Sequence, residues 1–336
     1  MGIINIPEGY KSPQSIKETE IAIKEVKDYF ERALAKELHL TRVSAPLFVK
    51  PESGLNDNLN GVERPVVFGI KEQGDAPVEI VHSLAKWKRM ALYEYGFEHG
   101  EGLYTDMSAI RRDEETDNIH SIYVDQWDWE RIITRAERCE DFLRKIVTRV
   151  YESLKFTEIF VNSRYPEIRP ILPEEITFIT TQELEDRWPD YTAKEREQAI
   201  AKERGAVFIM KIGKALNSGK PHDGRAPDYD DWELNGDIIV YYPLLDIGLE
   251  LSSMGIRVDE FSLMEQLKTA GCVERANLPF QKAVLEKRLP YTVGGGIGQS
   301  RICMFFLRRA HIGEVQSSIW PDNVLTMAKS HGINIL

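Results

Sequence analysis

Four glycines crowd a short segment near the C-terminus, Gly294-Gly295-Gly296-Ile297-Gly298-Gln299-Ser300-Arg301. Glycine lets a backbone approach a ligand closely, and a helix that begins just beyond these glycines would offer unpaired N–H groups to a phosphate. Neither common nucleotide loop fits, because a Walker A loop needs lysine where Gln299 stands, and a GxGxxG that began at Gly294 needs glycine there. The alternative is a tight strand-to-helix turn without a ligand, in which Arg301 is a solvated arginine.

A second polar cluster, Arg111-Arg112-Asp113-Glu114-Glu115, precedes the strand-like segment 121–130. An arginine at a strand end can hold a phosphate through its fork of N–H donors. Gln126 and Asp128 are two residues apart, so on a strand they face the same side and could together hold an ammonium group. The alternative is a charged surface loop beside a half-buried strand.

The third segment with chemical potential is 248–258, which contains Glu250, Ser252 and Arg257 among small residues. The small side chains leave room for a flat ligand. Carboxylate oxygens from Glu250 and Asp237 would suit Mg²⁺, which binds through one or two carboxylates together with substrate phosphates. An antiparallel strand with an exposed glutamate is the alternative.

The elements that must position these residues follow from periodicity, caps and turn residues. Ser12-Pro13 is typical of a helix start, and apolar residues recur at helical spacing to about 39. Many strands between hairpin-like turns, with helices at both ends, predict one α+β domain built on an antiparallel sheet. Further strands are expected at 41–49 (interrupted by Pro46), 66–70, 78–81, 121–129, 237–245 and 249–258. Further helices are expected at 83–95, 130–156, 260–270 and 280–288, with a final helix from Gln299, and loops are expected at 50–63 and 96–118. Within 174–212 we expect a strand, a helix and a second strand, and the capping box Thr192–Glu195 opens that helix.

Composition excludes several classes of protein. The chain has 336 residues, and its 43 Lys and Arg against 54 Asp and Glu give a net charge of −11, which is unfavourable for a protein that mainly binds polyanions. Hydrophobic content of 42% is that of a folded protein. The three cysteines form no cluster, so we expect free thiols. No signal-peptide pattern or bilayer-length apolar run is present, so we expect a soluble, cytoplasmic protein.

The order of the motifs resembles the class II aminoacyl-tRNA synthetase catalytic domain. The first helix with Val43–Pro46 resembles its first motif, near a dimer interface; Ile110–Glu114 resembles its second; and the glycine segment resembles its third. In that family an arginine of the second motif contacts the α-phosphate of ATP, and an arginine of the third supports ATP in a bent form. The resemblance implies a homodimer and a central antiparallel sheet flanked by helices, with residues 1–336 as a single adenylate-forming catalytic domain that includes the helix at about 13–39.

Longer strings resemble a narrower family, the ammonia-dependent aspartate–ammonia ligases (AsnA-type asparagine synthetases). They cover nearly the whole chain, and we see no departure at the motif positions. The strings are His82–Arg89, Gly100–Thr105, Tyr123–Glu130, Arg225–Trp232, Asn235–Asp237, Glu250–Arg257 and Gly294–Arg301.

This second resemblance implies a ligase that forms a carbon–nitrogen bond in two steps. Aspartate and ATP would give β-aspartyl adenylate and pyrophosphate, and ammonia would then give asparagine and AMP. Arg111 and Arg301 would neutralise the phosphates. Mg²⁺ would be held by Asp237 and Glu250.

The same resemblance places the remaining site residues. Asp57, Gln126 and Asp128 would hold the ammonium group of aspartate. Lys88 would pair with a carboxylate, and Arg257 could stack on adenine. Because the nucleophile must be NH₃, we hypothesise that Asp57 also accepts a proton as a base. Further expected contacts are Ser83 on the substrate side and Ser121, Asp230, Ser253, Gly295 and Gly296 on the nucleotide side, with Glu250 there as well.

Three other interpretations compete with this one. An aspartyl- or asparaginyl-tRNA synthetase would share the adenylate step, but it would need an anticodon-binding module, and we expect no nucleic-acid partner. A catalytically silent paralogue should have lost Arg111, Glu250 or Arg301, and all three are present. A glutamine-dependent enzyme would need a nucleophilic cysteine, and no cysteine has a suitable setting.

Overall fold

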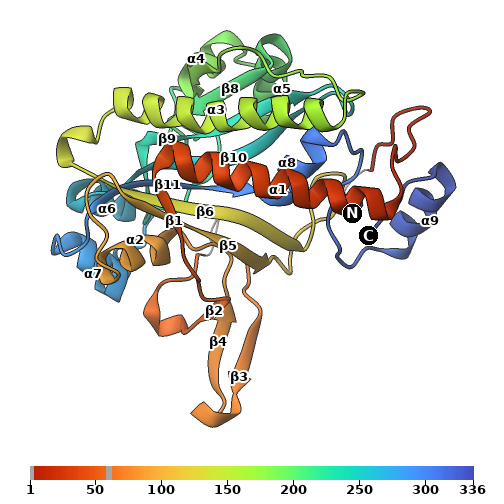
Figure 1. The fold of residues 1–336 in the computed structure, drawn as a ribbon. Helices are drawn as coiled ribbons and strands as arrows, with labels where there is room; N and C mark the ends of the chain where they lie inside the picture. Colours follow the sequence, from red (N-terminus) through yellow and green to blue (C-terminus); the bar gives the residue numbers. More distant parts are fainter. Residues whose placement is uncertain (1–3, 58–62) are drawn as a thin grey trace.

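The computed structural model describes residues 4–57 and 63–336, and in this part of the chain the central element is an eight-stranded sheet. Its strand order is β1-β5-β6-β11-β10-β9-β8-β7 (Figure 1). The two outermost pairings, β1 with β5 and β7 with β8, are parallel, and the others are antiparallel. The predicted α+β class is therefore confirmed. The strands are β1 Leu40–Arg42, β5 Gly102–Ile110, β6 Tyr123–Ile133, β7 Thr177–Thr180, β8 Ala206–Met210, β9 Asp230–Tyr242, β10 Ile247–Arg257 and β11 Tyr291–Gly298.

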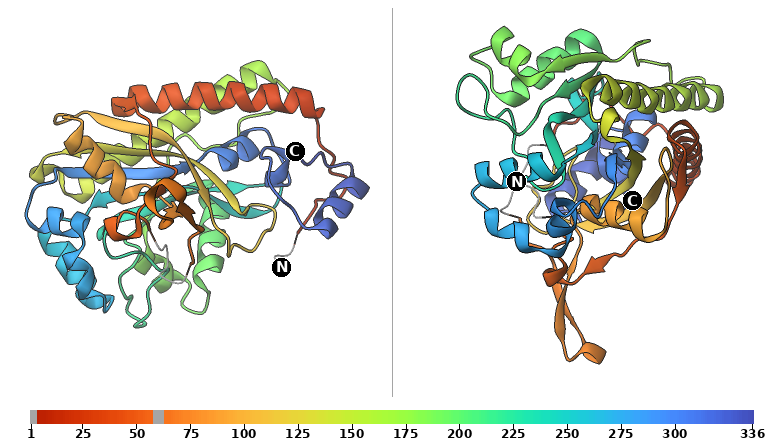
Figure 2. Two further views of the ribbon diagram at one scale, coloured as in Figure 1. Left: turned by 90° about the horizontal axis from the view of Figure 1, so that it is seen from below. Right: turned by 90° about the vertical axis from the view of Figure 1, so that its left-hand side faces the viewer.

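Two long helices, α1 (Ile16–Leu38) and α3 (Glu140–Arg164), lie side by side over one side of this sheet (Figures 1 and 2). The predicted start of α1 was three residues early, because Ser15 and Glu18 form the capping box, whereas the Ser12 hydroxyl bonds Glu314. The buried face of α1 joins the main core, which leaves the opposite side of the sheet open for a site. The other α-helices are α2 Ala85–Glu94, α4 Thr181–Arg187, α5 Ala193–Arg204, α6 Glu260–Thr269, α7 Pro279–Leu285, α8 Gln299–Phe306 and α9 Asp322–His331.

Two sequence predictions around β5 and β6 were wrong. The expected loop at 96–118 contains β5, whose side chains are buried over most of its length because neighbouring strands and layers cover it. Such a strand lacks the alternation that reveals a half-exposed one. The helix expected from 130 begins ten residues later, because β6 continues to Ile133 in register with β11. Glu140 follows only after a capped turn at Thr134–Glu137.

The glycine segment is mainly a strand and only at its end a turn. Gly295 and Gly296 pair with Trp129 and Asp128 of β6 on one side and with Met254 and Ser253 of β10 on the other. The chain turns into α8 at Gly298, as predicted. These glycines therefore lie in the middle of the sheet, where the absence of a side chain leaves space on its open side.

A smaller sheet projects from the body as an arm (Figures 1 and 2). Its strands are β2 (Phe48–Val49), β3 (Val67–Ile70) and β4 (Ala76–Ile80), which confirms the predicted hairpin. Helix α9, in contrast, was not predicted. Within residues 4–57 and 63–336, no helix has both the length and the apolar character needed to cross a bilayer.

Candidate active site

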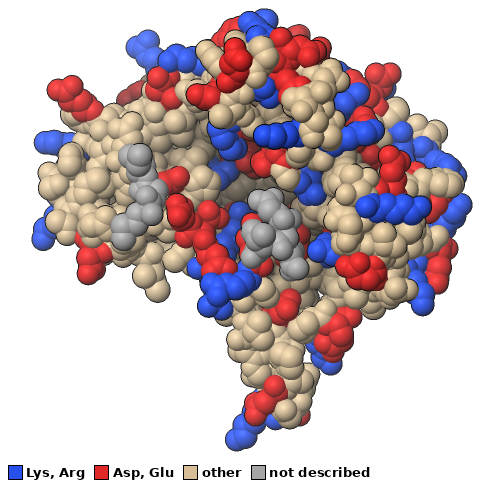
Figure 3. Space-filling view, turned by 180° about the vertical axis from the view of Figure 1, so that it is seen from behind, with Lys and Arg blue, Asp and Glu red and all other residues tan. Residues whose placement is uncertain are grey.

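A cavity of about 410 Å³ opens on the side of the sheet away from α1 and α3. Figure 3 shows a hollow in the middle of this face, with both acidic and basic side chains around it. Every predicted site residue lines the cavity except Asp237. The lining residues predicted from the sequence are Asp57, Ser83, Lys88, Arg111, Ser121, Gln126, Asp128, Asp230, Glu250, Ser253, Arg257, Gly295, Gly296 and Arg301.

Glycine at position 296 makes room for Gln126 and Asp128. A Cβ atom built on Gly296 would lie 2.6 Å from Gln126 Oε1 and 2.8 Å from Asp128 Oδ1, closer than side chains tolerate. Because Gly296 is directly opposite Asp128 in the antiparallel ladder, the two polar side chains of β6 fold over the bare glycine backbone. Gln126 and Asp128 therefore lie on the same face of β6, as predicted, and Gly296 of the adjacent strand β11 leaves the space that their side chains occupy.

Asp128 is a buried carboxylate with two partners. Its Oδ2 accepts from Leu84 N at 3.2 Å and lies 3.3 Å from Lys88 Nζ, which in turn donates to the Gly295 carbonyl at 2.9 Å. Burial lowers the pKa of Lys88 below its usual range, although Asp128 opposes that shift. Lys88 is therefore already paired with a protein carboxylate, and a contact with a substrate carboxylate stays a prediction.

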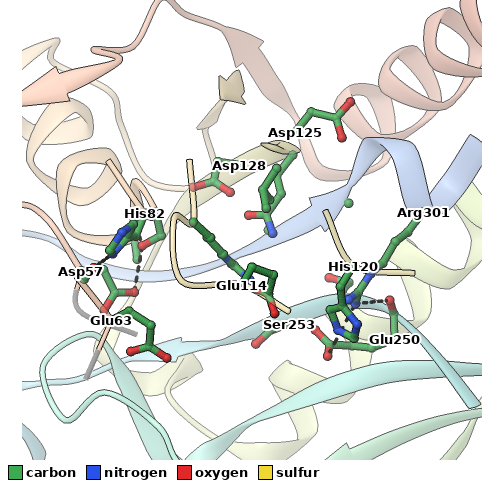
Figure 4. Close-up of a pocket in the computed structure, with 18 of the residues that line it drawn as sticks. Asp57, Glu63, His82, Glu114, His120, Asp125, Asp128, Glu250, Ser253 and Arg301 are labelled. Atoms are coloured by element: carbon green, nitrogen blue, oxygen red, sulfur yellow. Dashed lines mark hydrogen bonds and ion pairs between the residues drawn. The ribbon is translucent and has the colours of Figure 1, made fainter. Parts of the chain in front are cut away.

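The segment that leads to Asp57 meets the segment between β4 and α2. Asp57 is only 2% exposed, and its Oδ2 accepts a hydrogen bond of 3.0 Å from the Ser83 hydroxyl. The neighbouring His82 ring lies against the Asp57 backbone (Figure 4). Asp57, Ser83 and Asp128 thus gather at one end of the cavity, although they come from three separate segments.

Arg257 is enclosed at the back of the cavity. Its guanidinium donates to Glu130 at 2.8–3.0 Å and also bonds Asp230, while the Tyr229 ring lies 5.8 Å away. Burial would raise the pKa of Glu130, but Arg257 holds it below its ordinary value. Both carboxylates occupy the guanidinium, so the predicted stacking of Arg257 on adenine stays a prediction.

The other end of the cavity is rich in arginine. Arg111 follows β5, and its Nε is buried without a hydrogen-bond partner in the described part of the chain. Arg301, in the first turn of α8, donates to the Glu250 carbonyl at 3.0 Å and lies 3.8 Å from its carboxylate (Figure 4). Ser121 donates to Ser318 at 3.0 Å. Because Arg111 and Arg301 both line the cavity, it can attract a polyanion.

Asp237 and Glu250 are two carboxylates that repel each other beside Arg225. Asp237 bonds Arg225, and burial together with the nearby Glu250 raises the pKa of Asp237 to about 6. Burial opposes ionisation of Glu250 as well, but Arg301 and Arg225 hold its pKa below the usual range. Residues 4–57 and 63–336 contain no cluster of three or more metal-ligating side chains. Two neighbouring carboxylates are nevertheless the donor type that Mg²⁺ uses with substrate phosphates.

Sequence reasoning gave no role to many residues of the cavity wall, among them Arg225, Tyr229 and His82. Arg225 and His82 each open one of the strings quoted above, so the signal was present. The sequence could not assign a role to these side chains, because the role of each depends on which strand or loop it faces in the folded chain.

Comparisons with known proteins show the family to which the chain belongs. The family model described as "Aspartate-ammonia ligase" matches residues 17–332. A protein of Ruminiclostridium cellulolyticum named aspartate–ammonia ligase is 65% identical over 330 residues, 98% of each chain. One of Clostridium tetani with the same name is 66% identical over 331 residues, 98% of this chain and 97% of its own.

Solved structures show the fold at much lower identity. An asparaginyl-tRNA synthetase of Entamoeba histolytica in complex with asparaginyl-adenylate superposes with a TM-score of 0.63 at 14% identity, over 90% of this chain and 66% of its own. The asparaginyl-tRNA synthetase of Pyrococcus horikoshii gives 0.56 at 16% identity, over 90% and 70%. The fold is that of the class II aminoacyl-tRNA synthetases, as predicted, and the chain belongs to the aspartate–ammonia ligase family.

Proposed function

We propose that this chain makes asparagine from aspartate, ammonia and ATP through a β-aspartyl adenylate, with release of pyrophosphate and AMP. Membership of the ligase family gives the net joining of aspartate and ammonia. The observation that supports the chemical route is that acidic and basic groups line one cavity, which contains Asp57 and Asp128 as well as Arg111 and Arg301. In Figure 4, Asp57 and Asp128 lie on one side of this cavity and Arg301 lies on the other. An amino acid and a triphosphate would therefore meet in its middle.

The first step needs two anions to approach one another. The arginines at the phosphate end would neutralise ATP, with Arg111 at the α-phosphate and Arg301 toward the γ-phosphate. Asp57, Gln126 and Asp128 would hold the substrate ammonium group by charge-assisted hydrogen bonds. Fixing the ammonium group of aspartate and the phosphates of ATP would leave the β-carboxylate directed at the phosphorus, which is how orientation accelerates a reaction between two bound molecules.

Mg²⁺ fits the phosphate end through Glu250 and Asp237. When bound, the ion supplies charge neutralisation at the developing pyrophosphate. Its positive charge would also remove the repulsion that raises the pKa of Asp237 beside Glu250. Arg225, which now pairs with Asp237, would be free to turn toward a phosphate oxygen.

The second step needs NH₃ beside the activated carboxyl. Asp57 is buried in the acidic end of the cavity, where a carboxylate attracts ammonium and can accept its proton. The Ser83 hydroxyl bonds one Asp57 oxygen and so fixes the carboxylate's orientation. AMP is the leaving group, so this step needs no further nucleotide.

We also infer a homodimer. β1 is an edge strand of the large sheet, and the following segment exposes Leu47 and Phe48 with 47% and 41% of their surface accessible. An edge strand next to exposed apolar side chains is typical of a surface that pairs with a second chain. Sedimentation equilibrium tests this inference, because a monomer at micromolar concentration would contradict it.

A product assay tests the function. Purified protein is incubated with aspartate, ATP and Mg²⁺, and with ammonium, glutamine or tRNA in separate reactions. Asparagine and AMP from ammonium alone support the proposal. ADP as product, a requirement for glutamine, or aminoacylated tRNA would overturn it.

A further inference from the structure

His82 is a fully buried histidine in the wall of the cavity that the steps above leave unused. It lies between β4 and α2, next to Ser83, and its side chain is drawn beside Asp57 in Figure 4. Its backbone N–H donates to Asn56 Oδ1 at 2.9 Å, and the Asn56 amide bonds Glu79 and the Ile80 carbonyl. These bonds hold the His82 backbone against the segment that leads to Asp57.

The hydrogen bonds of the ring define its tautomer. His82 Nδ1 lies 2.9 Å from the Asp57 carbonyl oxygen. A carbonyl oxygen can only accept, so Nδ1 must carry the proton. In the neutral ring, Nε2 then has a lone pair and no hydrogen. That Nε2 atom is buried and has no hydrogen-bond partner among residues 4–57 and 63–336. A buried acceptor without a partner is unfavourable, and in a substrate cavity it points to a ligand that donates.

The proton balance of the second step calls for such an acceptor. Ammonium carries four hydrogens and the amide product keeps two, so two protons must leave while the N–C bond forms and the C–O bond to AMP breaks. The adenylate carries one negative charge and ammonium one positive charge, so the reactants are neutral together. AMP leaves with two negative charges, which the two released protons balance. A single carboxylate accepts one proton at a time, so Asp57 alone does not complete the step.

We propose that His82 Nε2 is the proton acceptor that converts bound ammonium to NH₃, while Asp57 accepts the second proton as the amide forms. This inference rests on the proposed function and assigns a catalytic role to a residue outside the amino-acid and ATP contacts described above. The Nδ1–H bond to the Asp57 carbonyl would strengthen as the ring becomes positive, and the adjacent Asp57 carboxylate stabilises that charge.

Other titratable groups share this end of the cavity and bear on any pH profile. The charged ones are Asp57 from the loop, Asp128 from β6 and Lys88 from α2, and Tyr229 lies just before β9. Tyr229 is buried, which raises its pKa well above the usual value, so it stays protonated at neutral pH. Among these groups and His82, the neutral imidazole is the one that offers a nitrogen lone pair without a hydrogen-bond partner in the described part of the chain.

The experiment uses His82→Asn in the full-length protein. The asparagine amide can keep the donor at the Nδ1 position but has no basic nitrogen. We expect ammonium-dependent asparagine synthesis to fall about 100-fold or more, which is the usual range for loss of a general base. Aspartate-dependent ATP–pyrophosphate exchange should stay near wild type, because adenylate formation needs no proton acceptor at this position.

Two further readouts separate catalysis from structure. Hydroxylamine is largely uncharged at neutral pH, so hydroxamate formation by His82→Asn should be close to wild type. The residual ammonium-dependent rate should rise with pH in proportion to free NH₃, more steeply than in wild type. His222→Gln is the matched control, since His222 is also buried with an unpartnered ring nitrogen in the described chain but does not line the cavity.

The outcomes distinguish this inference from the proposed function. Wild-type ammonium-dependent synthesis by His82→Asn, or an equal loss with ammonium and hydroxylamine, would overturn the role of His82. Absence of aspartate-dependent exchange in the wild-type protein would instead overturn the adenylate route itself.

Discussion

A single methyl group at position 296 should separate aspartate binding from ATP binding. Alanine in place of Gly296 would put a carbon 2.6 Å from Gln126 Oε1 and 2.8 Å from Asp128 Oδ1. To restore an ordinary contact of 3.4 Å, these oxygens must retreat by about 0.8 and 0.6 Å. The strand itself has little freedom to move, because β11 is paired on both sides, so the polar side chains must shift instead.

The size of the effect follows from the bonds that would be lost. Hydrogen bonds to charged groups contribute about 1.5–3 kcal/mol each. Losing one at the substrate ammonium group should lower kcat/KM for aspartate about 10- to 100-fold, since 1.4 kcal/mol is tenfold. A misplacement of about 1 Å can itself slow a reaction about 100-fold. We therefore expect a higher KM for aspartate and a lower kcat, with KM for ATP nearly unchanged.

Steady-state kinetics with aspartate and ATP varied in turn measure this split. Gly298→Ala is the matched control on the same strand, because its new carbon would lie 3.4 Å from the nearest atom, Arg301 Cβ, and should change both constants less than about twofold. Equal KM values for aspartate in Gly296→Ala and wild type would refute the placement of the ammonium group over Gly296.

Three further predictions concern other parts of the molecule. Arg111→Ala should reduce aspartate-dependent ATP–pyrophosphate exchange about 100-fold or more, and unchanged exchange would exclude Arg111 from the α-phosphate. Asp57→Asn should reduce asparagine formation more than exchange, and a normal rate of amide formation would contradict its role as a base. Burial lowers the pKa of His311 from 6.5 to about 4. Between these two pH values the unfolded chain binds a proton that the folded chain does not bind, so the folded state loses stability as the pH falls from about 6.5 toward 4. His311→Asn should therefore lose less thermal stability over that pH range than wild type does, and an identical slope in thermal denaturation would contradict this assignment.

Local chemistry was enough to predict many of the elements. The capping box at Thr192 and Glu195 forms as predicted, because its hydrogen bonds lie within one turn of α5. Gln126 and Asp128 share a face because a strand alternates. In contrast, β5 is buried by elements distant in sequence, and its composition alone does not indicate a strand.

In the candidate site, too, the sequence predicts the residues better than it predicts their contacts with distant segments. Nearly all of the site residues expected from the family resemblance line the cavity, but the sequence did not show what each one contacts. Asp237 pairs with Arg225 and Lys88 with Asp128, and both pairings depend on how separate segments meet. His82 was quoted only as the first residue of a string, because its orphaned Nε2 exists only after the Asp57 loop has packed on the ring. The single-domain organisation and the cytoplasmic location stay predictions.

The central claim is that the β-carboxylate of aspartate is activated by attachment to AMP. Aspartate labelled with a heavy oxygen isotope in the β-carboxylate, incubated with ATP, Mg²⁺ and ammonium, tests it most directly by mass spectrometry of the products. The account predicts one labelled oxygen in the phosphate of AMP for each asparagine formed. Label in inorganic phosphate with ADP as the nucleotide product, or AMP without label, would contradict it.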